Sequence, residues 1–334
     1  MWGLWLGGRS TGSPDHPLAL AHHLAHAARD IDEPGVRLQV NYAYGNNYFW
    51  LARYDEARRH LEMAIEQSAL VESRDLIARF GENSGVSARA FLAWIEWMEG
   101  KPEDAIRTAD QAIAIGRETG HAHTLAFALT FATVLHRHLR QPREAAAHLE
   151  ELAVLAETNG LRLWQAAAAV ILGWIQCAGG DENGLEMIRM AVEAAHQAMS
   201  AVEATFLSFW TEALFRLGRF EETLVLLERS LETVYRVQDN YLVPEFLRLK
   251  GDALLALSPE NAEQARTLFE EALAHAQAQG ANVLALRAAS SLVRHAASPD
   301  NLQKLKSCLD ACPTAGDFPD FSEARAMLAR ASRP

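Results

Sequence analysis

Two histidines one helical turn apart, His22 and His26, could bring metal chemistry to this chain. Side chains at positions i and i+4 lie on the same face of a helix, and two imidazoles there can share a zinc ion. A zinc site needs at least a third protein ligand, and the sequence offers none close by. The Glu of an H-E-x-x-H motif is also missing after the first histidine. This favours a solvent-facing helix edge, and we expect neither a metal nor another cofactor.

Two cysteines, Cys308 and Cys312, also share a predicted helix face, where reversible oxidation is one alternative. Free cysteines more often behave as small hydrophobic residues, which is the interpretation that we favour. With Cys177 the chain has three cysteines, an odd and sparse set that indicates a reducing compartment. No nucleophile elbow with a Ser/His/Asp ordering stands out, and no G-x-x-x-x-G-K-[ST] phosphate loop occurs. We therefore predict no catalytic residues and a protein that is not an enzyme.

The charge balance argues against nucleic acid as a partner. The 334 residues include 31 basic and 43 acidic side chains, a formal net charge of −12. A duplex binder needs a basic face, and no cluster of Lys and Arg supplies one. Residues 1–6 are apolar but too few for a signal peptide or a membrane span, so we expect no membrane partner and a cytoplasmic location. Abundant Ala without β-branched runs is typical of an all-α protein.

One short pattern recurs down the chain: a small residue, an apolar residue four positions later, and a third residue, usually small, three positions after that. Its first members lie 48, 40, 39, 39 and 42 residues apart, a period typical of stacked helical hairpins. Small side chains allow the two helices of a hairpin to cross closely, and the spacing forms one apolar stripe. The occurrences are Ala57/Leu61/Ala64, Ala105/Ala109/Ala112, Ala145/Leu149/Leu152, Gly184/Ile188/Ala191, Thr223/Leu227/Ser230 and Ala265/Phe269/Ala272.

Gly, Pro and polar residues separate the predicted helices, as at Gly100-Lys101-Pro102, where Gly ends one helix and Pro begins the next. We predict one continuous superhelical domain over residues 1–334. Residues 1–30 form a partial N-terminal repeat, with a loop at 7–14, and residues 298–334 form an irregular C-terminal cap, with a loop at 313–319. Long helices, as at 124–139 and 161–177, explain the long period.

Residues 41–65 resemble the tetratricopeptide (TPR) consensus, with Gly45 and Tyr48 on a first helix and Tyr54 after a short turn. The longer run 41–292 is similar to the C-terminal TPR region of large bacterial signalling proteins. In those proteins this region accompanies an AAA/STAND-type ATPase, often behind a class III adenylate/guanylate cyclase. The resemblance implies a sensor or scaffold, and the chain is a fragment of a larger protein or a free-standing relative. The segments that carry it are 79–88 with 92–94, 120–121 with 125–128, and 247–255 with 286–292.

The TPR resemblance also implies a set of groove residues, because the first helices of TPR hairpins line the concave surface. Aromatic and Arg side chains are the usual anchors of recognition surfaces, and here an aromatic half would meet a charged half. The alternative is that the large aromatics simply pack between hairpins. The predicted groove residues are Tyr42, Asn46, Phe49, Trp50, Trp94, Trp97, Arg137, His138, Glu212, Arg216, Arg248 and Asp252.

These observations predict a right-handed α-solenoid of about seven TPR-like hairpins. The function that we infer is a non-catalytic scaffold or regulatory module in bacterial signalling, which binds a protein or peptide partner, such as an ATPase or cyclase, in its groove. The alternative is a sensor of a small molecule or signal peptide that controls a linked or partner ATPase or cyclase. Self-association is a further possibility, because an uncapped N-terminal repeat exposes apolar surface.

Overall fold

The computed structural model describes residues 2–11, 17–198, 203–312 and 316–331. Over these residues the chain forms eighteen α-helices and two short 3-10 helices, η2 (Asn240–Leu242) and η3 (Pro259–Asn261), and no strand. The α-helices are α1 (Trp2–Thr11), α2 (Pro17–Ala28), α3 (Pro34–Trp50), α4 (Tyr54–Ser68), α5 (Ser73–Phe80), α6 (Ser84–Met98), α7 (Pro102–Glu118), α8 (Ala122–His138), α9 (Pro142–Thr158), α10 (Arg162–Ala178), α11 (Asn183–Ala198), α12 (Glu203–Arg216), α13 (Phe220–Val237), α14 (Val243–Leu257), α15 (Ala262–Gln279), α16 (Asn282–His295), α17 (Pro299–Asp310) and α18 (Pro319–Ala331).

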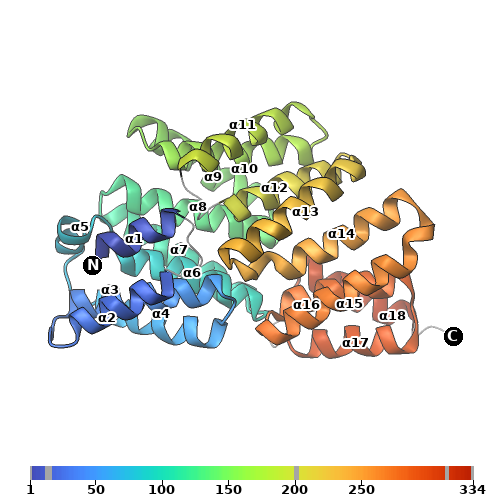
Figure 1. Cartoon of the computed structure of the whole chain (residues 1–334), viewed down its shortest axis with the longest axis horizontal. Helices are drawn as coiled ribbons and strands as arrows, with labels where there is room; N and C mark the ends of the chain where they lie inside the picture. The colour runs from blue at the N-terminus through green and yellow to red at the C-terminus, as the bar shows by residue number, and fades with distance from the viewer. Residues whose placement is uncertain (1, 12–16, 199–202, 313–315, 332–334) are drawn as a thin grey trace.

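Seven hairpins follow one another along the chain, as Figure 1 shows: α3–α4, α6–α7, α8–α9, α10–α11, α12–α13, α14–α15 and α16–α17. They stack into a right-handed α-solenoid of TPR-like units, which confirms the predicted fold class. Among the described residues, the first helix of every hairpin buries more of its residues than the second, which buries one apolar stripe. In a stacked array the first helices pack between neighbours, and the second helices expose one face to solvent.

A residue in the left-handed conformation follows the first helix in five of the hairpins. Three of these residues are glycines, Gly100, Gly180 and Gly218, and the other two are Ala52 (φ 58°) and Arg140 (φ 59°). The left-handed conformation ends the helix and reverses the chain, and a glycine adopts it without a steric penalty. The shared backbone geometry shows why the same turn recurs after α8, where the sequence Arg140-Gln141-Pro142 has no Gly.

The residues of the repeating pattern lie where the two helices of each hairpin cross. Ala57, Leu61 and Ala64 are completely buried between α3 and α4. Gly173 of α10 and Gly184 of α11 also approach closely, and a methyl group on Gly184 would lie 2.2 Å from the Gly173 carbonyl oxygen. Small residues therefore set the spacing of the helix pairs, as the sequence predicts.

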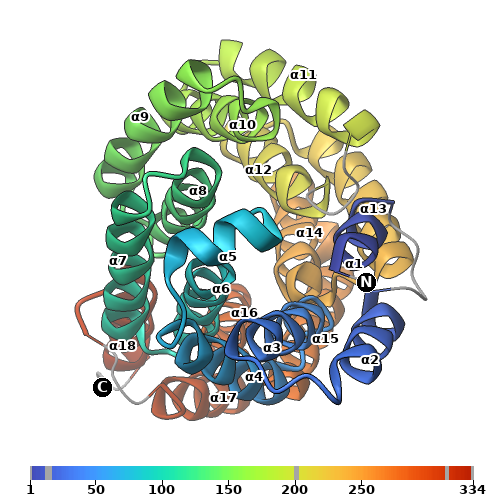
Figure 2. The same ribbon diagram turned by 90° about the vertical axis from the view of Figure 1, so that its left-hand side faces the viewer.

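The solenoid curves until its C-terminal hairpins return to its middle. Figure 2 shows the helices arranged around a central region, with α6, α8, α10 and α12 inside and α7, α9 and α11 outside. The Asn282 side chain donates to the Glu99 carbonyl oxygen (3.1 Å), and an Arg287 Nη donates to the His138 carbonyl oxygen (2.6 Å). Arg140 also forms an ion pair with Glu323 (2.6 Å). These contacts tie the C-terminal helices to the ends of α6 and α8.

Two details of the sequence prediction are wrong. The loop expected at 7–14 begins too early, because α1 continues to Thr11; residues 12–16 lie outside the described part. The helix α5 was not predicted, and its insertion between two hairpins explains why the first repeat interval is the longest. The loop expected at 313–319 falls partly outside the described residues, and the division into one domain with irregular ends stays a prediction. Among the described helices, none is long and apolar enough to span a membrane.

Candidate binding site

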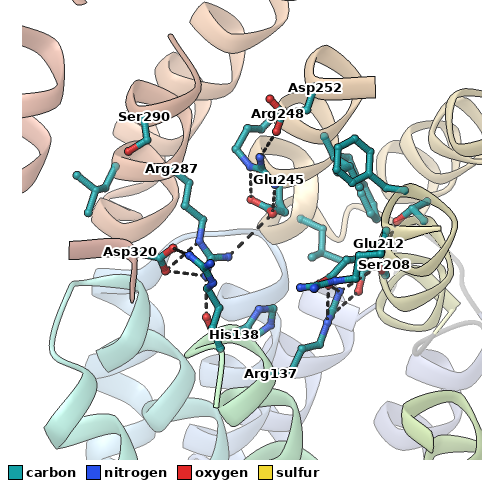
Figure 3. A pocket seen from close by; sticks show the side chains of 18 of the residues that line it. Arg137, His138, Ser208, Glu212, Glu245, Arg248, Asp252, Arg287, Ser290 and Asp320 are labelled. Atoms are coloured by element: carbon teal, nitrogen blue, oxygen red, sulfur yellow. Dashed lines mark hydrogen bonds and ion pairs between the residues drawn. The ribbon is translucent and has the colours of Figure 1, made fainter. Parts of the chain in front are cut away.

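A cavity of about 310 Å³ opens on the inner wall between α8, α12, α14, α16 and α18 (Figure 3). We call it the polar cavity, because arginines and carboxylates alternate around it. The positive and negative charges nearly balance, so the cavity forms a lattice of ion pairs and does not carry a strong field of one sign. Its charged residues are Arg137, Arg140, Arg216, Arg248, Arg287, Arg294, Glu212, Glu245, Asp252, Asp320 and Glu323.

Arg137, near the C-terminal end of α8, connects that helix to α12. Its guanidinium donates to Glu212 Oε2 (2.9 and 2.5 Å), to Ser208 Oγ (3.1 Å) and to the Ser208 carbonyl oxygen (3.0 Å). Its Cζ also lies 3.9 Å from the centroid of the Phe209 ring. The guanidinium is buried, so these charge-assisted bonds are shielded from water and stronger than surface pairs.

Glu212 is ionised at neutral pH because it lies between two arginines. Burial by itself would raise the pKa of this carboxyl group, but Arg137 and Arg216 lower it to about 2. The pKa of Glu245 on α14 is lowered in the same way: burial opposes ionisation, and the nearby Arg248 and Arg287 guanidinium groups outweigh it. These carboxylates are therefore fixed negative charges within the polar cavity.

Arg287 on α16 ties the returning C-terminal helices to the wall. It donates to Asp320 Oδ2 of α18 (2.8 Å) and to the carbonyl oxygen of His138, and it lies 4.0 Å from Glu245. The His138 imidazole stacks on Trp97, with ring centroids 4.3 Å apart. Burial first, and then Arg137 and Arg287, lower the pKa of His138 well below its usual value, so the ring is neutral at physiological pH.

A second cavity, of about 260 Å³, lies on the inner wall towards the N-terminus, and we call it the aromatic cavity. It is lined by rings from six helices, α1, α3, α6, α8, α10 and α12, and by a few polar side chains, which include Asn46, Glu82 and His123. An apolar cavity with few convergent polar groups is typical of small-ligand sites. Its aromatic residues are Trp5, Tyr42, Trp50, Phe91, Trp94, Phe127, Phe131, Trp164, Phe206 and Phe209.

The structure divides the predicted groove residues between these two cavities. Four of them, Tyr42, Asn46, Trp50 and Trp94, line the aromatic cavity. Six others line the polar cavity, namely Arg137, His138, Glu212, Arg216, Arg248 and Asp252. Their assignment to a ligand or partner stays a prediction.

Phe49 and Trp97 line neither cavity. Phe49 is completely buried, with its ring 5.4 Å from that of Tyr241, and Trp97 is covered by His138. The expectation that these two side chains face the groove is therefore corrected: they pack between helices. The physical reason is the closure of the solenoid, which brings η2 and α16 against this part of the wall.

Several lining residues were missed by the sequence analysis. Residues 163, 164, 167 and 171 of α10 line the aromatic cavity, and residues 286, 287, 290 and 294 of α16 line the polar cavity with the same spacing. The sequence analysis named groove residues on the other first helices but none on α10 or α16. The same search on these two helices would have found Trp164 and Arg287. Trp5 and Glu82 lie on an N-terminal helix and in a loop, outside the hairpin register, so no repeat-based signal marks them.

The histidine pair and the cysteine pair that the sequence analysis considered for metal binding and oxidation are explained by ordinary contacts and burial. His22 Nδ1 lies 2.9 Å from the Tyr44 hydroxyl, and His26 lies 3.3 Å from Arg29. Within the residues that the structure describes, no group of three or more His, Cys, Asp or Glu is placed to hold a metal. Cys308 and Cys312 are free and buried, and burial raises their pKa values to about 11 and about 12. Both are therefore thiols at neutral pH, the less reactive form.

No protein-family model matches this chain, and no curated protein matches it. Two solved structures of Rap proteins share its fold. The apo form of RapI superposes with a TM-score of 0.51 at 12% identity, covering 86% of this chain and 99% of RapI. A Rap protein complexed with Competence and Sporulation Factor superposes with a TM-score of 0.54 at 15% identity, covering 92% of this chain and 80% of the Rap chain. Yeast Tom70 is more distant, with a TM-score of 0.43 at 12% identity, covering 93% of this chain and 57% of Tom70.

Proposed function

We propose that this protein is a non-catalytic binding and regulatory module that holds a peptide, or a segment of a partner protein, on its inner wall. The observation that carries the proposal is that two sets of recognition side chains line cavities on the inner wall. The polar cavity holds the charged set, and the aromatic cavity holds the aromatic set. Proteins anchor partners with these residue types, and most members of both sets come from the first helices of successive hairpins.

The polar cavity suits a peptide because its side chains are already ordered. Arg137, Arg248 and Arg287 are held by carboxylates before any ligand arrives, so binding costs little further side-chain entropy. Arg294 differs from them: it is exposed, donates to the Ser291 hydroxyl (2.8 Å) and has no carboxylate within 4.0 Å among the described residues. Its guanidinium is available for a peptide carboxylate.

Support also comes from a solved structure of the same fold, the Rap protein with Competence and Sporulation Factor bound. Following the resemblance to the TPR regions of signalling proteins, we place the module in bacterial signalling, where the regulated partner would be an ATPase or cyclase. Binding would change the pitch of the solenoid, because its hairpins contact mainly their neighbours and small changes add along the array.

The test is a synthetic array of short peptides, probed with the purified full chain, followed by calorimetry on the selected peptides. We expect a sequence-related set with a carboxylate in common, and affinity that falls about ten-fold or more in Arg294→Ala. The matched control is Arg189→Ala on the outer helix α11, an exposed arginine that should leave binding unchanged. Selection of no peptide, or equal binding by both variants, would refute the proposal.

A second candidate function, the sensing of a small molecule, is favoured by the aromatic cavity. A peptide backbone needs many hydrogen-bonding partners along its length, whereas this cavity offers mostly ring faces and only a few polar groups. The two functions are compatible, because one cavity can bind the regulator while the other binds the partner.

A further inference from the structure

Two side chains of the aromatic cavity, Glu82 and Asn46, offer hydrogen-bond acceptors that no Lys or Arg of the described residues contacts, and the buried Nε1 of Trp5 is a donor that no described residue accepts from. Glu82 follows Gly81, the left-handed residue that ends α5, and precedes Asn83, the N-cap of α6. Its carboxylate is buried beside the cavity and accepts hydrogen bonds from the Ser84 hydroxyl (2.9 Å) and the Ser87 hydroxyl (3.4 Å). Both donors are neutral. In the described part of the chain, no Lys or Arg nitrogen lies within 4.0 Å of this carboxylate.

A second acceptor in the cavity wall is Asn46 of α3. Its side chain is 5% exposed, and Oδ1 accepts no hydrogen bond from the described residues. A buried amide oxygen without a donor is unfavourable by an amount comparable to a lost hydrogen bond, so a ligand donor here would be stabilising. Asn46 therefore points independently to a ligand that carries N–H or O–H groups.

The rings around these acceptors favour positive charge. Aromatic faces are negative, so several faces around one space attract a cation, and ten aromatic residues line this cavity. His123 adds no positive charge: Trp164 Nε1 donates to its Nδ1 (3.1 Å), and burial lowers its pKa, which keeps the ring neutral. A bound cation would meet Glu82 and ring faces, with no opposing charge on the imidazole.

We propose that the aromatic cavity is a binding site for a small organic ammonium compound, a protonated amine on an aromatic body. The ammonium group would pair with the Glu82 carboxylate and donate to Asn46 Oδ1, while the body packs between the rings. The volume of about 260 Å³ is close to the lower limit for ligand pockets, which selects a compact amine. This inference deepens the second candidate function and does not depend on peptide binding in the polar cavity.

Burial raises the pKa of Glu82 to about 7, because the carboxylate is desolvated and no cation of the described residues lies beside it. An ammonium ligand would supply the missing counter-charge and favour the ionised form, so binding should release a proton near neutral pH.

The test uses three probes with the same phenyl body and different charge: 2-phenylethylamine, 2-phenylethanol and 3-phenylpropionate. Each is titrated into the purified full chain, with isothermal calorimetry and tryptophan fluorescence as readouts. We expect saturable binding of the amine, at least about ten-fold tighter than that of the alcohol, and no saturable binding of the anion. Equal affinity for amine and alcohol, or no binding of the amine, would overturn the inference.

Variants locate the site. Glu82→Gln should weaken amine binding at least about ten-fold and leave alcohol binding unchanged, since it removes the charge and keeps the shape. Glu186→Gln, a matched loss of an exposed carboxylate on α11, should change neither. If Glu82→Gln does not fold, Asn46→Leu is the second variant and should also weaken amine binding. Undiminished amine binding in a folded variant of either residue would overturn the inference. A failed peptide array with successful amine titration would refute only the peptide proposal.

Discussion

Replacing Arg137 by Met should destabilise the protein more than any exposed arginine does. Methionine keeps much of the apolar stem that packs beside Phe209, but it removes the four hydrogen bonds to Glu212 and Ser208. Breaking a buried ion pair by removing one partner costs about 3–5 kcal/mol, because the other charge stays buried. Glu212 keeps its contact with Arg216 and is 24% exposed, so we expect a loss of about 3 kcal/mol in the free energy of unfolding.

The double variant Arg137→Met with Glu212→Met distinguishes two causes of the lost stability. One is the loss of the attraction between the two side chains, and the other is the cost of leaving the Glu212 carboxylate buried without Arg137. It removes the carboxylate as well, and it leaves Arg216, which is 43% exposed and can be solvated by water. The double variant should therefore recover at least about half of the stability lost in the single variant.

Urea unfolding followed by far-UV circular dichroism measures these differences. Hydrogen exchange of α12 amides adds a local measure, because a solenoid need not unfold in two states. Arg189→Met is the control, since Arg189 forms exposed ion pairs with Glu186 and Glu193 within α11, and it should give no measurable change. Equal midpoints for Arg137→Met and the control would refute the reasoning.

Three further predictions concern pH and packing. Burial raises the pKa of Glu82 from 4.5 to about 7, so its contribution to stability is fully present below pH 4.5 and is lost as the pH rises to 7. Between pH 5 and pH 8 the free energy of unfolding of Glu82→Gln should therefore rise relative to wild type by on the order of 3 kcal/mol. A difference in urea midpoint that stays constant with pH would contradict this. The pKa of Glu212 is lowered to about 2, so its contribution to stability is fully present above pH 4.5 and is lost as the pH falls towards 2. The stability of Glu212→Gln should therefore depend less on pH over this range, as measured by circular dichroism during acid unfolding. Gly184→Ala would place a methyl group 2.2 Å from the Gly173 carbonyl oxygen and should lower the free energy of unfolding by about 1–3 kcal/mol. Gly3→Ala is the control and should not change stability, because Gly3 is also the second residue of its helix but a methyl group there has no atom within 4 Å. Similar melting curves for the two variants would disprove the tight crossing.

The hairpins could be predicted because their signals are local. A small residue at each crossing, and a Gly or Pro at each turn, lie within one repeat and act on neighbouring helices. The helix α5 escaped prediction because its eight residues carry no such pattern and bury one residue, Leu76. The later part of α1 was taken for a loop because Gly7 and Gly8 disfavour helix by propensity.

The candidate site was predictable in part for the same reason. The helical register on α3, α6, α8, α12 and α14 selects side chains that share one face of the solenoid, and most of those named line a cavity. The helical spacing cannot show which of these side chains another segment covers. For this reason Phe49 and Trp97 were predicted to face the groove, whereas they pack between helices. Glu82 lies in a loop, where no periodicity applies. Only the tertiary structure shows that no Lys or Arg of the described residues lies beside its carboxylate.

The sequence by itself determined the repeated unit, because steric fit at a helix crossing and the conformational preference of a turn depend on residues a few positions apart. Only the tertiary structure decided that the array closes. Arg287 reaches the backbone of His138 across 149 positions because small rotations between successive hairpins accumulate, and no single residue encodes their sum. That closure adds side chains of α14, α16 and α18 to the wall of the polar cavity. Burial between helices then gives Arg137 and Glu212 their electrostatic properties.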